Sequence, residues 1–205
     1  VDLNEAVSGL LRMLGRLIGE HIALVWQPGA AAPPVVMDPS QCHQILVNLC
    51  VNARDAIAGQ GTITLTTGAA RFTADTVASH PWRRPGDYAV LEVRDDGCGM
   101  DAAAQARIFE PFYTTKGVNE GTGLGLPTVY GIVHQNGGFL EVASEPGQGA
   151  TFTIYLPAAD RRQAAPPASP VETAPATPGA TILLVEDEPS LLQMTRLMLT
   201  EMGYG

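Results

Sequence analysis

Three polar or glycine-rich segments constrain this chain more than any other feature. They are the pair Asn48 and Asn52, the run Asp95-Asp96-Gly97-Cys98-Gly99, and the run Gly121-Thr122-Gly123-Leu124-Gly125-Leu126. Glycines lack a Cβ and let a backbone approach a phosphate closely, and a glycine-rich loop that enters a helix aims unpaired N–H groups at an anion. One such motif alone would be weak evidence for a nucleotide site. Three in this order, within one domain's length, predict a nucleotide pocket.

Length, charge and cysteine content limit the class of protein. The chain has 205 residues, of which 45% are hydrophobic, enough for one core with a part left over. Its net charge is −9 and its basic residues are not clustered, so we expect no nucleic-acid partner and no membrane contact. Cys42, Cys50 and Cys98 match no metal-ligand spacing and are expected to be buried thiols of a cytoplasmic fragment.

Apolar periodicity and turn residues predict a domain of alternating helices and strands. Helices are expected over residues 4–18, 38–58, 101–108 and 123–136, and strands over 21–27, 63–72, 88–94, 139–144 and 150–156. The first helix is expected to bury one face, made of Ala6, Leu10, Leu14, Leu17 and Ile18. Asp38 and Pro39 are typical of a helix start.

The C-terminal part has a different composition. Residues 158–179 are rich in Ala, Pro, Thr and Ser, which cannot build a core and therefore predict a linker. After it, residues 181–185 are typical of a buried strand, and a helix is expected to follow. We expect residues 180–205 to be the truncated start of a second domain, either disordered or packed against the first domain or a neighbour.

The helix expected at 38–58 carries the first set of candidate ligands. Asn48, Asn52 and Asp55 share one face, while a second face is apolar, formed by Leu46, Leu49, Ala53 and Ile57. Asparagine is a poor helix former, so two of them one turn apart need a reason. A single one could cap or bridge backbone; the pair predicts amide oxygens that complete a Mg²⁺ shell beside phosphate oxygens. Arg54 either reaches a phosphate or is solvated.

Asp95 supplies the second candidate contact. A carboxylate at a strand end can accept the exocyclic amine of adenine while the ring slides against Gly97 and Gly99. Taken alone, the same residues could form an ordinary Asp-Gly turn.

The third set surrounds a polar loop. Phe109 and Phe112 are expected to be core residues that anchor a mobile segment. Lys116 begins a short polar loop, where a flexible cation can meet the terminal phosphates. Residues 114–122 are therefore expected to act as a lid hinged on Gly117 and Gly121.

Four of these segments carry a family resemblance. Asn48-Leu49-Cys50-Val51-Asn52-Ala53, Asp95-Asp96-Gly97-Cys98-Gly99, Phe109-Glu110-Pro111-Phe112 and Gly121-Thr122-Gly123-Leu124-Gly125 resemble the N, G1, F and G2 boxes of sensor histidine kinases. The resemblance implies that residues 1–157 form a Bergerat fold, an α/β two-layer sandwich with a mixed sheet covered by helices on one face. It also places Thr151 near the adenine, on the last strand.

The resemblance implies ATP and Mg²⁺ as cofactors. It gives catalytic roles to Asn48 and Lys116 and a metal-binding role to Asn52. The residues expected to contact the nucleotide are Asn48, Asn52, Asp55, Asp95, Gly97, Gly99, Met100, Lys116, Gly121, Thr122, Gly123, Leu124, Gly125, Leu126 and Thr151.

The chain resembles a hybrid kinase in which neither end of the phosphorelay is present. Residues 180–202 resemble the first strand and helix of a receiver domain, with Glu186 and Asp187 at its acidic Mg²⁺-binding pair. None of the histidines heads a helical hairpin, so a dimerisation domain with the phosphoacceptor histidine is an expected partner, as is a receiver domain or response regulator. The parent protein could be membrane-anchored through segments outside this chain.

Two other functions stay open. One is an ATP-hydrolysing protein of the same fold, similar to gyrase, the heat-shock 90 chaperones or the mismatch-repair proteins. Those carry a glutamate one turn before the metal-binding asparagine; this chain has Asn48 there, and an amide is a poor base. The other is a non-catalytic module that senses a nucleotide.

Overall fold

The structure is a computed structural model that describes residues 1–73, 83–115, 122–159, 184 and 196. The chain divides into two units, Val1–Ala159 and Asp160–Gly205. All the helices and strands given below belong to the first unit. The expected linker beyond Ala159 and nearly all of the expected receiver start lie outside the described residues.

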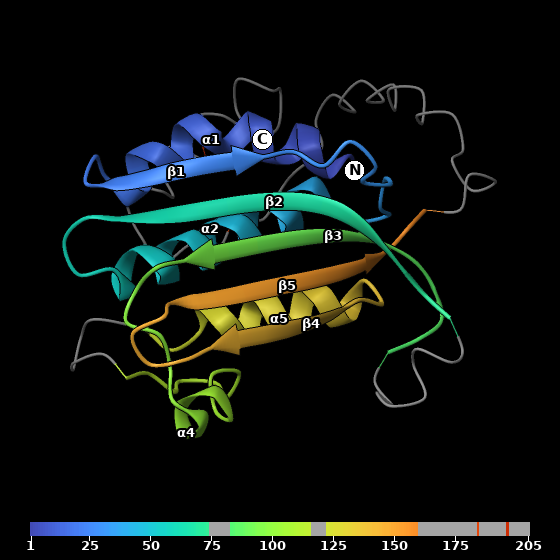
Figure 1. Ribbon diagram of the computed structural model, residues 1–205. Helices are drawn as coiled ribbons and strands as arrows, with labels where there is room; N and C mark the ends of the chain where they lie inside the picture. The colour runs from blue at the N-terminus through green and yellow to red at the C-terminus, as the bar shows by residue number, and fades with distance from the viewer. Residues whose placement is uncertain (74–82, 116–121, 160–183, 185–195, 197–205) are drawn as a thin grey trace. The chain divides into compact units, whose positions relative to one another are not determined.

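A five-stranded sheet forms the centre of the first unit (Figure 1). Its strands are β1 (Ile22–Gln27), β2 (Gly61–Phe72), β3 (Gly86–Asp95), β4 (Phe139–Ser144) and β5 (Ala150–Pro157). Their spatial order is β1-β2-β3-β5-β4. β1 and β2 run parallel, and the other neighbouring pairs are antiparallel. The sheet is therefore mixed, which confirms the predicted fold class.

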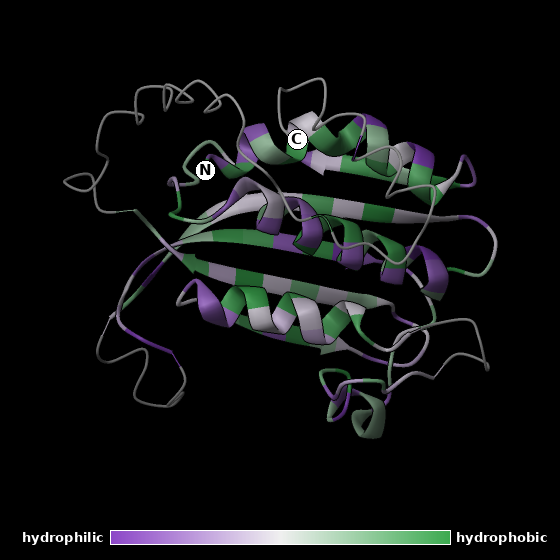
Figure 2. Ribbon diagram, turned by 180° about the vertical axis from the view of Figure 1, so that it is seen from behind, coloured by the Kyte–Doolittle hydropathy of each residue, from purple (hydrophilic) through white to green (hydrophobic). Residues whose placement is uncertain are grey.

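Helices cover one face of this sheet. α1 (Leu3–Ile18), α2 (Pro39–Ala56) and α5 (Gly125–Gln135) lie side by side across it, and the short α4 (Ala102–Gln105) stands apart (Figures 1 and 2). Strand side chains point alternately to the two faces, so Ala89, Leu91 and Val93 of β3 are buried beneath the helices. The core lies between one layer of helices and one layer of strands.

α2 begins as the sequence predicts. The Asp38 side chain accepts a hydrogen bond from the Ser40 N–H at 2.7 Å, and Pro39 is the first helical residue. Hydrogen bonds from the side chain and the backbone of Ser40 hold the pKa of Asp38 below its usual value. The predicted apolar stripe is buried. The helix ends at Ala56 rather than at residue 58 because Ile57 adopts an extended conformation.

The core-facing side of α1 differs from the prediction. Leu10, Leu14 and Ile18 are buried, but Leu17 is exposed; Leu3 and Val7 join the buried face instead. Successive residues turn by about 100° around a helix, so a stripe that includes Leu3 and Val7 leaves Leu17 at its edge.

Both ends of the first unit pair with one short segment. Val35 exchanges two backbone hydrogen bonds with Val1, of 2.9 Å and 2.6 Å, and forms an antiparallel bridge with Ala158. The Ala159 N–H donates to the Pro34 carbonyl at 2.8 Å. Residues 34 and 35 therefore join the first residue of the unit to its last ones.

The cysteines differ in burial. Cys42 and Cys50 are buried as predicted, and burial raises the pKa of their thiols to about 11 and about 12. Cys98 is exposed, so its predicted burial is wrong. Among the described residues, no helix combines the length and the apolar character needed to cross a membrane.

Candidate functional site

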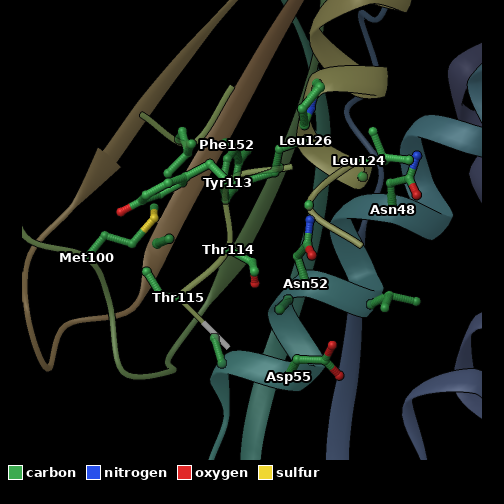
Figure 3. Close-up of a pocket in the computed structure, with 18 of the residues that line it drawn as sticks. Asn48, Asn52, Asp55, Met100, Tyr113, Thr114, Thr115, Leu124, Leu126 and Phe152 are labelled. Carbon is green, nitrogen blue, oxygen red and sulfur yellow. The ribbon is translucent and has the colours of Figure 1, made fainter. Parts of the chain in front are cut away.

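A pocket of about 690 Å³ opens between α2, the loop after β3 and the start of α5. The predicted site residues that line it are Asn48, Asn52, Asp55, Asp95, Gly99, Met100, Thr122, Gly123, Leu124, Gly125 and Leu126. Figure 3 shows the polar side chains of α2 on one side of this pocket and Met100 and Phe152 on the other. The structure thus brings the three predicted segments to one cavity.

The α2 side of the pocket is polar. Asn48, Asn52 and Asp55 follow one another along the helix on its pocket side (Figure 3). The first residue of α5 lies directly opposite: a Cβ on Gly125 would stand 3.5 Å from Asn52 Nδ2 and 3.6 Å from Asn48 Oδ1. A side chain at this position would therefore be in van der Waals contact with the two amides.

Arg54 is held in place by neighbouring groups. Its Nε donates to Asp55 Oδ1 at 2.8 Å, and its Nη1 donates to the Leu17 carbonyl at 3.1 Å. The side chain also lines the pocket. In this arrangement Arg54 is an ion-pair partner at the edge of the site, tied to the end of α1.

Asp95 is a buried carboxylate on the sheet side. It is 4% exposed, and its Oδ1 accepts the N–H groups of Gly97 at 2.9 Å and of Ala150 at 3.3 Å. Burial raises the pKa of Asp95 above its usual value, while these two hydrogen bonds lower it. Both bonds go to one oxygen, so Oδ2 is the atom that can accept a hydrogen bond from the pocket.

The two glycines after Asp95 have different roles. Gly99 lines the pocket with a φ of +66°, and a Cβ there would stand 2.0 Å from the Glu145 carbonyl oxygen. Gly97 does not line the pocket, which differs from the prediction. It packs on the end of α2 instead, where a Cβ would stand 2.7 Å from the Ala56 carbonyl oxygen. Gly97 thus lets the loop close onto α2.

Thr151 also lies away from the pocket. Its neighbours on β5, Ala150 and Phe152, line the cavity. Because side chains alternate along a strand, Thr151 points to the opposite face of the sheet. The structure therefore does not support the predicted contact between Thr151 and the base.

The start of α5 offers backbone donors. Its N-cap residue, Leu124, makes no side-chain capping hydrogen bond. The N–H groups of the first turn have no partner within a helix, and the N-terminal end of a helix carries a partial positive charge. These donors belong to Gly125 and Leu126, which both line the pocket. This end of the pocket can bind an anion.

Part of the predicted lid lies outside the described residues, including Lys116, Gly117 and Gly121. At its two ends, Thr114, Thr115 and Thr122 line the pocket.

The two phenylalanines before this segment differ. Phe109 packs against the core, and its ring lies 5.2 Å from that of Tyr130. Phe112 is 74% exposed with a φ of +66°, so its predicted core position is wrong. Its N–H donates to the Gly123 carbonyl at 3.0 Å. Phe112 is thus fixed by its backbone, with its side chain directed to solvent.

Some lining residues were not predicted. They include Gln44, Cys98, Ala104, Ile108, Tyr113, Thr128 and Phe152. A signal existed for Phe152, which has the strand parity of the buried residues of β5. In the described part of the chain, no group of three His, Cys, Asp or Glu side chains gathers as a metal site.

The chain has clear relatives. The profile of a family described as histidine kinase-, DNA gyrase B-, and HSP90-like ATPase matches residues 37–160. The sensor kinase CckA of Brucella abortus (strain 2308) is 43% identical over 212 residues, which cover 100% of this chain and 22% of that protein. The sensor histidine kinase ZraS of Klebsiella oxytoca is 37% identical over 77% of this chain and 31% of its own length. The chain spans about a fifth to a third of these relatives.

Solved structures show the same fold. The mycobacterial sensor histidine kinase MprB matches with a TM-score of 0.60 at 22% identity, covering 77% of this chain and 95% of that one. Full-length ShkA in complex with AMPPNP matches with a TM-score of 0.57 at 29% identity, covering 85% of this chain and 34% of that one.

Proposed function

This chain belongs to the family of histidine kinase-, DNA gyrase B- and HSP90-like ATPases, and we propose that its first unit is the ATP-binding catalytic domain of a sensor histidine kinase. The observation that carries this proposal is the single cavity at which the α2 amides, Asp95 and the start of α5 meet. In this role the domain binds Mg-ATP and presents the γ-phosphoryl group to a histidine on another domain.

Asp95 is the proposed base-recognition residue. Its Oδ2 accepts the exocyclic amine of adenine, while Oδ1 stays bonded to the backbone of Gly97 and Ala150. Guanine carries an acceptor oxygen where adenine carries that amine, and two acceptors facing each other in a buried site cost free energy. The pocket should therefore select adenine over guanine.

The phosphates of ATP belong at the end of the pocket formed by the start of α5. The uncapped N–H groups of Gly125 and Leu126 suit anionic oxygens. The Asn52 amide oxygen, with Asp55 one turn away, fits Mg²⁺, which takes a few protein oxygens and completes its shell with phosphates and water. When bound, Mg²⁺ neutralises phosphate charge. Lys116 is the proposed cation for the terminal phosphates.

Phosphoryl transfer asks mainly for positioning and charge neutralisation. The attacking nucleophile is an imidazole of the partner domain, so no water-activating base is needed. Asn48, which stands one turn before Asn52, suits this role because an amide orients a phosphate without activating water. We place the reaction in the cytoplasm.

We further propose that the linker expected at 158–179 begins after Ala159, because Ala158 and Ala159 are bonded to the first unit, and that 180–205 begin a receiver domain. The match to CckA over the whole chain supports an origin of this segment in a longer sensor kinase. A dimerisation domain with the acceptor histidine and a receiver domain or response regulator are the proposed partners.

Ligand titration tests the nucleotide proposal. Mg-ATP should bind wild type, and Asp95→Asn should bind it at least tenfold more weakly, on the order of one lost charged hydrogen bond. Asp96→Asn is a matched control, because Asp96 is exposed, accepts the Thr62 N–H at 2.8 Å and does not line the pocket. Equal binding by Asp95→Asn and wild type would refute the base assignment.

Turnover separates the kinase from the other two functions. Incubation with ATP and a supplied dimerisation domain should give one phosphohistidine per acceptor with slow background hydrolysis. Rapid, repeated hydrolysis by the chain alone would favour an ATPase, the other activity in the family description. Binding without transfer would favour a nucleotide sensor.

A further inference from the structure

One wall of the pocket contains the short helix α4, which lies between residues that pack against the core: Met100 before it, and Ile108 and Phe109 after it. α4 has only four residues, Ala102–Gln105, and none of them is buried. Ala104 nevertheless lines the pocket, as does Met100 just before the helix. The N-cap bond, from the Ala104 N–H to Asp101 Oδ1 at 2.7 Å, lies within this segment and does not attach it to the sheet. The attachment of α4 itself to the sheet comes from a side-chain contact.

Gln105 provides that contact. Its Nε2 donates to the Met100 carbonyl at 3.1 Å and to the Ser144 carbonyl at 2.9 Å. A primary amide carries two N–H donors, so both bonds form together. Ser144 is the last residue of β4, and Gln105 therefore joins α4 both to the sheet and to the loop after β3.

Ser144 extends the connection toward Asp95. Its Oγ accepts the Met100 N–H at 2.9 Å and donates to the Gly149 carbonyl at 2.7 Å. The next residue, Ala150, donates its N–H to Asp95 Oδ1. Gln105 and Ser144 are both half-buried and neither lines the pocket. They reach the cavity only through the backbone that they hold.

We propose that Gln105 and Ser144 are positioning residues that set the affinity of the pocket for the adenine base. The inference rests on the proposed function, because it assigns the wall at Met100 and Ala104 to the base. The base is remote from the reacting phosphate, so losing this support weakens the ground state and the transition state equally. The KM for ATP should rise while kcat at saturation stays constant.

The test uses Gln105→Leu and Ser144→Ala with adenosine as the ligand, since adenosine carries no phosphate charge. Each variant should bind adenosine more weakly by about tenfold, the effect of one or two side-chain hydrogen bonds. Gln105→Lys keeps N–H donors and should recover most of the affinity, whereas Gln105→Glu cannot donate and should not. The double variant should lose less than the product of the single losses, because both residues hold one segment.

Gln27→Leu is the matched control, because Gln27 is exposed at the end of β1 and is not a lining residue. Thermal unfolding shows whether each variant is folded. If Gln105→Leu unfolds at a lower temperature than wild type, the adenosine affinity of Ser144→Ala tests the proposal. The inference is overturned if folded variants bind adenosine as wild type does, or if kcat falls while KM is unchanged. If wild type itself binds neither adenosine nor ATP, it is the proposed function that fails.

Discussion

At the scale of single residues, Asp95 combines a cost for folding with a proposed role in binding. Its carboxylate is buried, and burial raises its pKa against the opposing effect of the hydrogen bonds from Gly97 and Ala150. A buried charge that is only partly compensated destabilises the native state. Asparagine at this position would keep the Oδ1 acceptor and remove the charge. Stability alone therefore does not explain the carboxylate, which agrees with the base recognition proposed for Asp95.

This predicts a pH dependence that Asp95→Asn should lack. Because the pKa of Asp95 is raised above 3.8, the native state binds a proton at pH values where the unfolded chain has lost it. The contribution of this group to stability therefore grows as pH falls through the native pKa and is complete below the unfolded pKa. Adenine binding should weaken over the same range, because protonated Oδ2 no longer accepts.

Urea unfolding and ATP titration from about pH 7 down to about pH 4 measure both effects. Comparing wild type with Asp95→Asn cancels the other titrating groups. Parallel stability curves for wild type and Asp95→Asn would contradict the prediction.

Sequence patterns predict which residues reach the pocket better than they predict the direction of each side chain. Helix periodicity places Asn48 and Asn52 correctly, because a helix fixes the direction of every side chain from its spacing. The same reasoning fails for Phe112. Its left-handed backbone turns the ring to solvent, and its N–H is bonded to the carbonyl of Gly123, which is distant in the sequence. The predicted position of Thr151 came from the family resemblance alone, whereas the alternation along β5 puts Ala150 and Phe152, and not Thr151, on the pocket side.

At the scale of elements, the approach to α5 depends on one glycine. Gly123 has a φ of +64°, and a Cβ there would stand 2.4 Å from the Phe112 carbonyl carbon. Gly131 lies in the same helix, and nothing stands within 4 Å of the position its Cβ would take. The two glycines therefore respond in opposite ways to an added methyl group.

Gly131→Ala should stabilise the protein by about 0.5–1 kcal/mol, because alanine is the better helix former and meets no obstacle. Its ATP affinity should equal that of wild type. Gly123→Ala should lower stability and weaken ATP binding, since the strained backbone and Phe112 must both shift. Chemical unfolding and ATP titration measure these changes. A destabilised Gly131→Ala variant, or a Gly123→Ala variant with full affinity, would contradict this view of α5.

At the scale of the whole first unit, the sequence predicted the elements but not their spatial order. The β4–β5 hairpin follows from two apolar runs separated by a turn, and β4 and β5 do pair. The insertion of β5 between β3 and β4 depends on long-range pairing, such as Val93 with Phe152, which no local pattern shows. The mixed sheet was expected only because of the family resemblance.

The proposed domain boundary can be tested by truncation. A chain that ends at Ala159 should unfold cooperatively and bind ATP as the full chain does, because the described core and pocket lie before that residue. A chain that ends at Thr153 should fail to fold, since it lacks the buried residues Ile154 and Leu156. Circular dichroism and ATP titration compare the two. Loss of cooperative unfolding in the longer fragment would place the boundary further along.

The pairing of Val35 with both Val1 and Ala158 has a mechanical consequence. A force applied between Val1 and Ala159 would load the few hydrogen bonds of residues 34 and 35, whereas the pocket is lined by other residues.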